Sequence, residues 1–178
     1  MIRQAEGVLA WAEAALGRPI PRTEAEIGHD SMLEDDFYAV AQPILKETEL
    51  DYLVGVTPSM IAFQESKTEV AWDYLSSYQK NLILVSAFDL RKFAREIRRP
   101  YDVFLGVLIL GQLLVAQSYP QVHFHDDRGC LFDFNDDRTR LKQSVRDLTI
   151  EPECLARIPS NFRVAAQSLV GLLRTYPR

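Results

Sequence analysis

The sequence predicts an α+β domain, and three observations lead to that fold class. Two short runs, residues 51–57 and 81–87, are rich in β-branched and apolar side chains, as buried strands are. Segments with helical periodicity lie before and after these runs. The composition, 47% hydrophobic and 25% charged over 178 residues, is that of a globular chain with one core. We therefore expect a single domain over residues 1–178.

Two helices are expected in the N-terminal part, residues 1–50. The first spans residues 1–16 and ends at Gly17 and Pro19. The second begins with Ser31 as N-cap and Glu34 three residues later, the pattern of a capping box. It should run to about Gln42, because Pro43 forces a boundary or a kink. The inward stripe of the first helix comprises Ile2, Val8, Leu9, Ala12 and Leu16.

The middle of the chain contains the expected strands. "DYLVGVT" (51–57) and "NLILVSA" (81–87) are predicted core strands, and "MIAFQ" between them is a candidate edge strand. "TEVAWDYLSSY" fits either a helix or a strand. Residues 89–98 are predicted to be helical. A second, apolar helix follows over about 101–117, between Pro100 and Pro120.

The last third is expected to contain a hairpin and two helices. "QVHFH" and "CLFDF" alternate like short strands around the turn "DDRG". Asp136 or Asp137 can cap a helix over "RTRLKQSVRDL". A C-terminal helix is predicted over 160–175. Its expected inward residues are Phe162, Val164, Ala165, Leu169, and Leu172 or Leu173.

Charge and composition argue against several functions. A net charge of −5 disfavours nonspecific nucleic-acid binding, and the basic run "LRKFAREIRR" is typical of a solvated helix face. The apolar run "VFLGVLILGQLLVA" is shorter than the roughly 20 residues of a membrane span and is predicted to be a buried helix. Glu6 and Glu13 interrupt the only candidate signal segment. Two cysteines make no disulfide framework, so a reducing, cytoplasmic setting is expected. Phosphate-loop, dinucleotide and nucleophile-elbow motifs are missing.

The segment "HFHDDRGCLFDFNDD" (123–137) concentrates the residues that carry chemistry. In an extended strand His123 and His125 point to one face, with Cys130 five residues beyond. Cys154 can add a second thiolate, and Glu151 or Glu153 a carboxylate. Nitrogen and sulfur ligands favour zinc, and a closed set of four favours a structural site. The predicted metal ligands are therefore His123, His125, Cys130 and Cys154.

Two other interpretations of the same segment stay open. His123 can be a strand residue whose ring bonds to a backbone carbonyl, and Cys130 and Cys154 can be small buried hydrophobes. The aspartates can instead hold a hard cation such as calcium or magnesium, or serve turns and helix caps. These aspartates are Asp126, Asp127, Asp133, Asp136 and Asp137.

From about Leu53 to Ile158, the chain resembles the archaemetzincin branch of the zinc metallopeptidases. That family carries His-Glu-x-x-His-x-x-Gly-x-x-His-Cys, four residues, Cys-x-Met and, about seventeen residues later, Cys-x-x-Cys. Here "HDDRGCLF" gives His125, four residues and Cys130, and "EPEC" follows eighteen residues after Phe132. "YLVGVT" and "NLILVSAFDLRKF" are similar to the strands that precede the family's active-site helix. The resemblance implies a zincin-like fold, with a small mixed β-sheet packed on helices.

The resemblance also implies one surviving and one lost metal site. The family's outer zinc site maps to His125, Cys130, Glu151 and Cys154, where histidine and glutamate replace two cysteines. The positions of the His-Glu-x-x-His motif fall in "LLVAQS". They are occupied by Leu113, Leu114 and Gln117, or by Leu114, Val115 and Ser118 in the other register. Neither set can hold zinc or accept a proton from its water, so catalysis by the family's mechanism is not expected.

The predicted function is a non-catalytic metallopeptidase-like domain that binds or regulates a protein or peptide and contains a structural zinc. One alternative is an active metal-dependent hydrolase with a rearranged site at His123 and His125. Another is a metal-free interaction subunit. Neither a nucleic-acid nor a membrane partner is expected.

Overall fold

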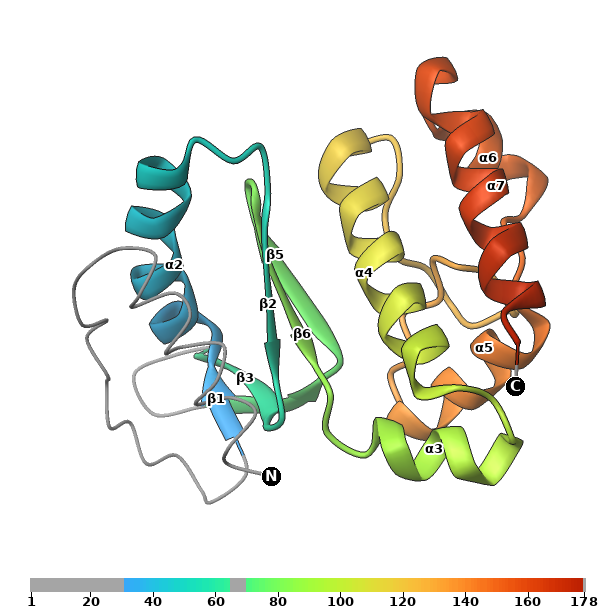
Figure 1. The fold of residues 1–178 in the computed structure, drawn as a ribbon, viewed down its shortest axis with the longest axis horizontal. Helices are drawn as coiled ribbons and strands as arrows, with labels where there is room; N and C mark the ends of the chain where they lie inside the picture. Colours follow the sequence, from blue (N-terminus) through green and yellow to red (C-terminus); the bar gives the residue numbers. More distant parts are fainter. Residues whose placement is uncertain (1–30, 65–69, 178) are drawn as a thin grey trace. The chain divides into compact units, whose positions relative to one another are not determined.

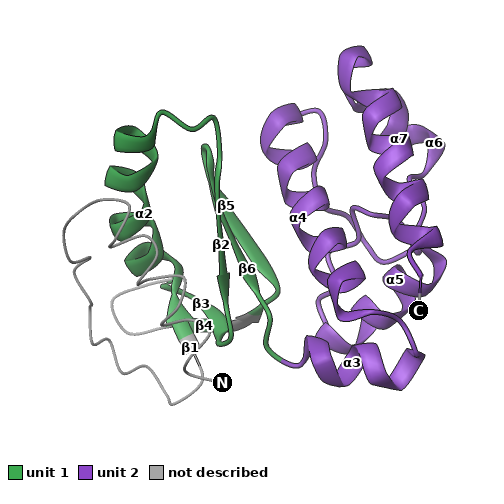
Figure 2. Cartoon of the chain, in the orientation of Figure 1, with its two compact units in different colours: residues 1–88 green, residues 89–178 purple. Residues whose placement is uncertain are grey.

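The computed structural model describes residues 31–64 and 70–177, and the predicted first helix lies outside these ranges. The chain forms two compact units, unit 1 over residues 1–88 and unit 2 over 89–178 (Figure 2). Unit 1 contains the described strands and one helix, whereas unit 2 is helical. The prediction of a mixed α+β chain is confirmed. The prediction of one domain stays a prediction, because two compact units can fold together or separately.

Unit 1 contains two three-stranded sheets, of order β1-β3-β4 and β2-β6-β5 (Figure 1). In each sheet the central strand pairs in parallel with one neighbour and antiparallel with the other. The segment "MIAFQ" is thus a central strand, not the edge strand we expected. The described elements of unit 1 are β1 (Ser31–Leu33), α2 (Glu34–Thr48), β2 (Leu53–Thr57), β3 (Met60–Gln64), β4 (Val70–Tyr74), β5 (Ser76–Gln79) and β6 (Leu82–Ser86).

Strand β6 is the most buried element of unit 1, because all five of its residues lie inside. Helix α2 packs on β2 and β6, and its residues Tyr38 and Ala41 form a core cluster with Leu82. The ring of Phe37 lies where a Cβ atom at Gly55 would stand, so only glycine allows α2 to approach β2 this closely. Both predicted strands form, but only β6 is a core strand, because β2 lies at the edge of its sheet and its Val56 is 42% exposed.

The start and end of α2 differ from the prediction. Ser31 belongs to strand β1 instead of capping a helix, and the N-cap residue Leu33 has no side chain that bonds to the helix. The helix also continues through Pro43 to Thr48. Leu45, in the last turn, packs against the core cluster. Tertiary packing of this turn offsets the hydrogen bond that proline removes.

Unit 2 is built around α4, which packs against three other helices (α3, α5 and α7; Figure 1). Its elements are α3 (Leu90–Ile97), α4 (Tyr101–Ser118), the short 3-10 helix η1 (Arg138–Arg140), α5 (Leu141–Asp147), α6 (Pro152–Arg157) and α7 (Ser160–Thr175). The predicted helices 89–98, 101–117 and 160–175 are confirmed. The six-residue helix α6 was not predicted, because it is too short to show a hydrophobic period.

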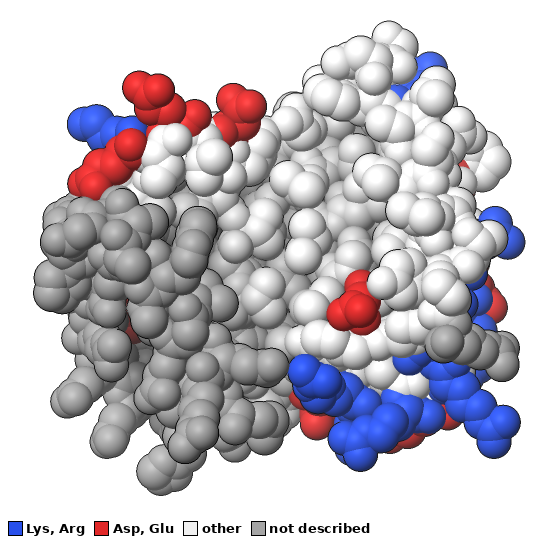
Figure 3. All heavy atoms as spheres, viewed as in Figure 1, with Lys and Arg blue, Asp and Glu red and all other residues white. Residues whose placement is uncertain are grey.

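Helix α4 matches the prediction of a buried apolar helix. It is the one helix in the described ranges that is long and apolar enough to cross a membrane, but 56% of it lies inside the protein. Core helices of soluble proteins meet the same criterion. Four of the five basic residues in the run before it are exposed, on α3 and its C-cap, at the lower edge of unit 2 in Figure 3. The fifth, Arg99, is half-buried and donates a hydrogen bond to the carbonyl oxygen of Leu173 (2.8 Å). The prediction of a solvated helix face therefore holds for four of the five residues.

The predicted hairpin of "QVHFH" and "CLFDF" is wrong. Residues 121–137 form no strand, and only isolated bridges join His125 to Asp133 and Cys130 to Thr149. The alternation rule for side chains consequently fails here: His123 is exposed, whereas His125 is half-buried. Hydrogen bonds donated to a buried carboxylate organise this segment in place of a strand ladder, as described below.

Helix α7 also presents a different face to the core than predicted. Ala166 and Val170 are buried, and Leu173 packs against Gly106 of α4. The expected inward residues Val164, Ala165, Leu169 and Leu172 are exposed. One residue corresponds to about 100° of rotation in a helix, so the face that contacts α4 lies beside the predicted stripe. Leu173 occupies the space that a Cβ atom at Gly106 would need, which matches the observed inward face.

Candidate metal centre

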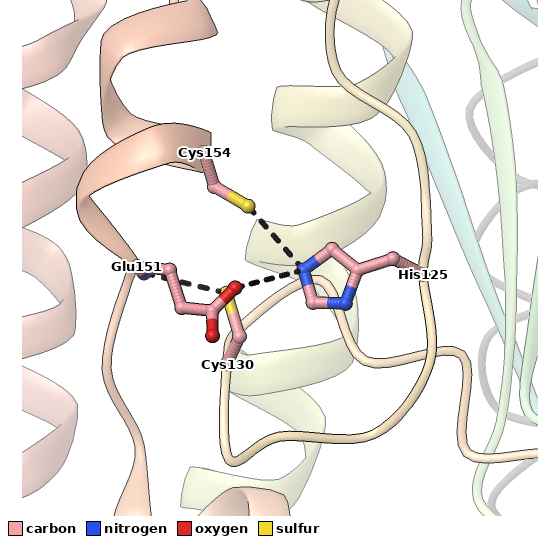
Figure 4. Close-up of side chains that lie close together, drawn as sticks. All are labelled: His125, Cys130, Glu151 and Cys154. Atoms are coloured by element: carbon pink, nitrogen blue, oxygen red, sulfur yellow. Dashed lines mark hydrogen bonds and ion pairs between the residues drawn. The ribbon is translucent and has the colours of Figure 1, made fainter.

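Four side chains of unit 2 converge on one point: His125, Cys130, Glu151 and Cys154 (Figure 4). His125 and Cys130 come from the segment of residues 123–137, which we call the ligand loop. Glu151 is the N-cap residue of α6 and Cys154 lies in its first turn. One ligand atom from each residue lies within 4.8 Å of all the others. The four residues can therefore hold a metal ion.

Two of the distances between these atoms are close to the edges of a tetrahedral site. His125 Nε2 is 3.3 Å from Cys154 Sγ and 3.7 Å from Glu151 Oε2. Zinc bonds to nitrogen, oxygen and sulfur predict ligand–ligand edges of roughly 3.3–3.8 Å in a tetrahedron. Only small side-chain movements are needed to bring the set around one ion.

A buried carboxylate shapes the ligand loop. Asp133 Oδ2 accepts hydrogen bonds from the backbone N–H groups of Gly129 (2.7 Å) and Cys130 (3.1 Å). Its Oδ1 accepts one from the N–H of Arg128 (2.9 Å). The hydroxyl of Ser144, on α5, lies 2.9 Å from Oδ2. These bonds fold residues 128–130 around one side chain and so place the thiol of Cys130.

The backbone selects the ring nitrogen of His125 that faces the cluster. Nδ1 lies 2.8 Å from the carbonyl oxygen of Asp126, which can accept a hydrogen bond from an N–H at this nitrogen. That contact leaves the lone pair of Nε2 directed at Cys154 and Glu151, as in Figure 4. A second-shell hydrogen bond of this kind fixes the tautomer and the ring orientation of metal-binding histidines.

Both thiols are buried. Burial raises the pKa of the Cys130 thiol, while an N–H···S hydrogen bond from the backbone of Glu151, 3.5 Å long, opposes that rise. Burial, with the adjacent Cys130, raises the pKa of Cys154 to about 12. Without a cation at their centre, the two sulfurs are stable together only as thiols. A divalent ion would replace these protons.

Glu151 shares its carboxylate between the cluster and a surface arginine. Its Oε2 lies 3.7 Å from His125 Nε2 and 3.6 Å from Arg128 Nη1. The Glu151 side chain is 28% exposed and that of Arg128 is 53% exposed. The cluster is thus closed on the side of the sulfurs and reaches solvent at its carboxylate.

Three of the four predicted ligands come together, and the fourth does not join them. His125, Cys130 and Cys154 belong to the cluster, whereas His123 is exposed on the preceding stretch of chain. Of the two candidate glutamates, Glu151 completes the cluster, and Glu153 is exposed. The set is the one that the family resemblance implied.

Sequence reasoning missed the residues that support the cluster. Asp133 was interpreted as one of several turn aspartates, and Arg128 as part of a turn. One signal was present: in "CLFDF" the aspartate is flanked by apolar residues, and a carboxylate in such a run needs buried donors.

Other aspartates of the loop serve turns and caps. Asp127 accepts a hydrogen bond from the backbone N–H of Asn135 (2.7 Å) and pairs with Arg140 (3.1 Å). Asp136 also contacts Arg140, and Asp137 caps η1 through the N–H of Thr139 (2.8 Å). These contacts match the turn-and-cap interpretation of the acidic residues.

The positions to which the resemblance assigned the catalytic motif lie on α4. Leu114, Val115 and Ser118 are buried, Leu113 is half-buried and Gln117 is exposed. This part of the helix offers packing surface and none of the imidazole or carboxylate groups that a hydrolytic zinc needs.

No family model matches the chain, and neither the curated proteins nor the solved structures include a match to it.

Proposed function

We propose that this protein is a non-catalytic relative of the zinc metallopeptidases, whose helical unit is stabilised by a structural zinc and which acts by binding a protein or peptide. One observation carries the proposal: the convergence of His125, Cys130, Glu151 and Cys154, with both thiols buried. Two thiolates, an imidazole and a carboxylate form a ligand set that favours zinc over hard cations.

The position of the cluster in the chain supports a structural role. Cys130 and Cys154 are 24 residues apart and belong to segments with no shared helix. An ion bound to both would cross-link the ligand loop to α6. Four protein ligands leave no position for a reactive water, which is the arrangement of a structural zinc.

The apolar character of α4 supports the absence of hydrolysis. Leu114 and Val115 occupy positions where the resemblance places metal-binding and proton-accepting residues. A binding role then remains for the scaffold. The sheets of unit 1 have edge strands, β2 and β5 among them, and an extended peptide can add to such an edge by main-chain hydrogen bonds.

Metal analysis of protein prepared without chelators tests the zinc. We expect about one zinc per chain and, after cobalt substitution, the intense absorption of a tetrahedral thiolate site. The Cys130→Ser, Cys154→Ser double variant should bind no zinc. His123→Ala is the matched control: it removes an exposed histidine of the same loop and should leave the metal content unchanged.

A peptidase assay on the zinc-loaded protein tests the absence of catalysis. No chelator-sensitive cleavage of unfolded protein substrates is expected. Metal-free wild-type protein of full stability would refute the structural zinc. Chelator-sensitive hydrolysis that His123→Ala abolishes would instead establish the rearranged hydrolytic site.

A further inference from the structure

The four residues of the cluster differ in how firmly their side chains are held. Both cysteines are buried. The His125 side chain is 15% exposed, and its Nδ1 is anchored 2.8 Å from the carbonyl oxygen of Asp126. The Glu151 side chain is 28% exposed and reaches the cluster from its open side (Figure 4). Glu151 is therefore the ligand that can leave with the least disruption of unit 2.

Only the side chain of Glu151 has to move for it to leave the cluster. Its backbone N–H donates to Cys130 Sγ (3.5 Å), and its carbonyl oxygen accepts a hydrogen bond from the N–H of Leu155 (2.8 Å). Both bonds stay in place when the side chain rotates. The first turn of α6, which carries Cys154, consequently keeps its conformation during such a change.

Arg128 offers the carboxylate of Glu151 a second partner. Its Nη1 lies 3.6 Å from Oε2, the same oxygen that lies 3.7 Å from His125 Nε2. A carboxylate bound to a divalent ion shares its charge with the ion, so it attracts an arginine less strongly than a free carboxylate does. Release of the carboxylate strengthens its pair with Arg128, and this gain offsets part of the lost metal bond.

The incoming ligand that the centre favours is a thiolate. Carboxylate is a donor that zinc shares with hard cations, whereas thiolates select zinc. With Glu151 bound, two thiolates and a carboxylate leave one net negative charge on a centre with a divalent ion. A thiolate in place of the carboxylate leaves that charge unchanged. It also gives the ion three sulfur ligands and one nitrogen, which is one of the tetrahedral sets of structural zinc.

We propose that Glu151 is an exchangeable ligand, which the thiol of a cysteine in a protein or peptide partner displaces from the metal. This inference rests on the proposed function, because it requires the metal centre and names the chemical group by which the partner is held. The bond between the ion and the Glu151 carboxylate breaks, a bond between the ion and the incoming sulfur forms, and the thiol proton passes to solvent. The freed carboxylate pairs with Arg128.

Cobalt-substituted protein and two short peptides test the exchange. One peptide contains a single cysteine, and the other has serine in its place. The cysteine peptide should increase the thiolate-to-cobalt charge-transfer absorption while the cobalt stays bound. X-ray absorption of the zinc form should then show a third sulfur neighbour beside those of Cys130 and Cys154. The serine peptide should leave both spectra unchanged.

Removing the carboxylate should leave the fourth position open. Where an open state makes up about 10% of the protein or less, a variant that is always open binds its ligand at least about tenfold more tightly. Glu151→Ala, saturated with cobalt, should show this gain for the cysteine peptide. A site that the peptide reaches without displacing Glu151 would show no gain, and that result would overturn the exchange.

Arg128→Gln should weaken binding of the cysteine peptide by about fivefold, as expected for a partly exposed ion pair. Arg128→Lys should recover most of the affinity. Arg140→Gln is the matched control: it removes an equally exposed arginine that pairs with Asp127 (3.1 Å), and it should leave peptide binding unchanged.

The role of Arg128 is isolated by combining the two changes. In the Glu151→Ala background, Arg128→Gln should have little effect, because no carboxylate is left for the arginine to receive. Equal losses in both backgrounds would show that Arg128 attracts the peptide directly, and would overturn its role as the second partner of Glu151.

The outcomes separate this inference from the proposed function. A chain that binds no metal overturns both. A chain that binds cobalt with a spectrum insensitive to the cysteine peptide overturns the exchange alone and leaves the structural zinc in place. Extraction of the cobalt by the peptide, or an equal response to the serine peptide, overturns the exchange in the same way.

Discussion

Helix α4 and the ligand loop belong to the same unit and are held in place by different physics. Residues such as Val103 and Phe104 fix α4 by removing apolar surface from water. The ligand loop contains a buried carboxylate, a buried thiol and a half-buried imidazole, and depends on directed hydrogen bonds. Apolar packing tolerates small shifts, whereas a polar cluster loses most of its stabilisation when one partner is absent. The predictions below use this difference.

Metal removal is expected to have the largest effect, and it should act through the ligand loop. With free zinc about 1,000-fold above its dissociation constant, binding adds about 4 kcal/mol to the free energy of unfolding. Urea titrations in zinc buffer and in chelator would measure it. The Cys130→Ser, Cys154→Ser variant should show the same midpoint in both buffers. Equal midpoints for the wild-type protein would mean that the loop needs no ion.

Leu114→Ala tests the apolar side of the comparison. This residue is 7% exposed on α4, and its truncation leaves a cavity that should lower the free energy of unfolding by about 3 kcal/mol. Zinc content should stay at the wild-type value, because Leu114 contributes no ligand atom to the candidate metal centre. If the variant lost zinc as well, the two segments would be coupled and the comparison would fail.

Asp133→Asn should affect stability and metal binding together. The amide keeps the size of the carboxylate but loses its charge and one of its acceptor atoms, so part of the set of bonds from residues 128–130 is broken. We expect a loss of about 2 kcal/mol in the free energy of unfolding and weaker zinc binding, because Cys130 is no longer held in place. Ser144→Ala removes the hydroxyl that donates to Asp133 and should cost about 1 kcal/mol. A stable Asp133→Asn variant with normal zinc affinity would show that the loop is held by other contacts.

The same difference decides what the sequence could predict. Helix α4 and strands β2 and β6 repeat apolar residues with a clear period or in a continuous run, and their existence and approximate bounds follow from that pattern. The ligand loop has no period. Its conformation depends on which donors surround Asp133, and these come from backbone groups and from Ser144 of another element. Spacing alone led to a hairpin that does not form.

The candidate site was predicted in part for the same reason. Cysteine and histidine are few in this chain, so Cys130, Cys154 and His125 could be proposed from residue type alone. Residue type alone could not choose Glu151 over Glu153 or His123, because α6 has too few residues to predict, and only the resemblance assigned Glu151. Likewise, the register of α7 depends on how Leu173 meets Gly106 and is not contained in the period of α7 itself.

Arg128→Gln should have a small effect and gives the sharpest distinction within the ligand loop. Two thiolates and a carboxylate around a divalent ion leave one net negative charge, and Arg128 Nη1 stands 3.6 Å from that carboxylate. Removing such a second-shell partner weakens metal binding about tenfold, which competition with a chromophoric chelator can measure. The cobalt spectrum should not change, since all four ligands remain. Arg128→Lys, which keeps the charge, should recover most of the affinity, whereas Glu151→Gln should alter both affinity and spectrum. If Arg128→Gln bound zinc as tightly as the wild-type protein, the pair with Glu151 would be a surface contact of no consequence for the metal, and the cluster would depend on Asp133 and its hydrogen bonds alone.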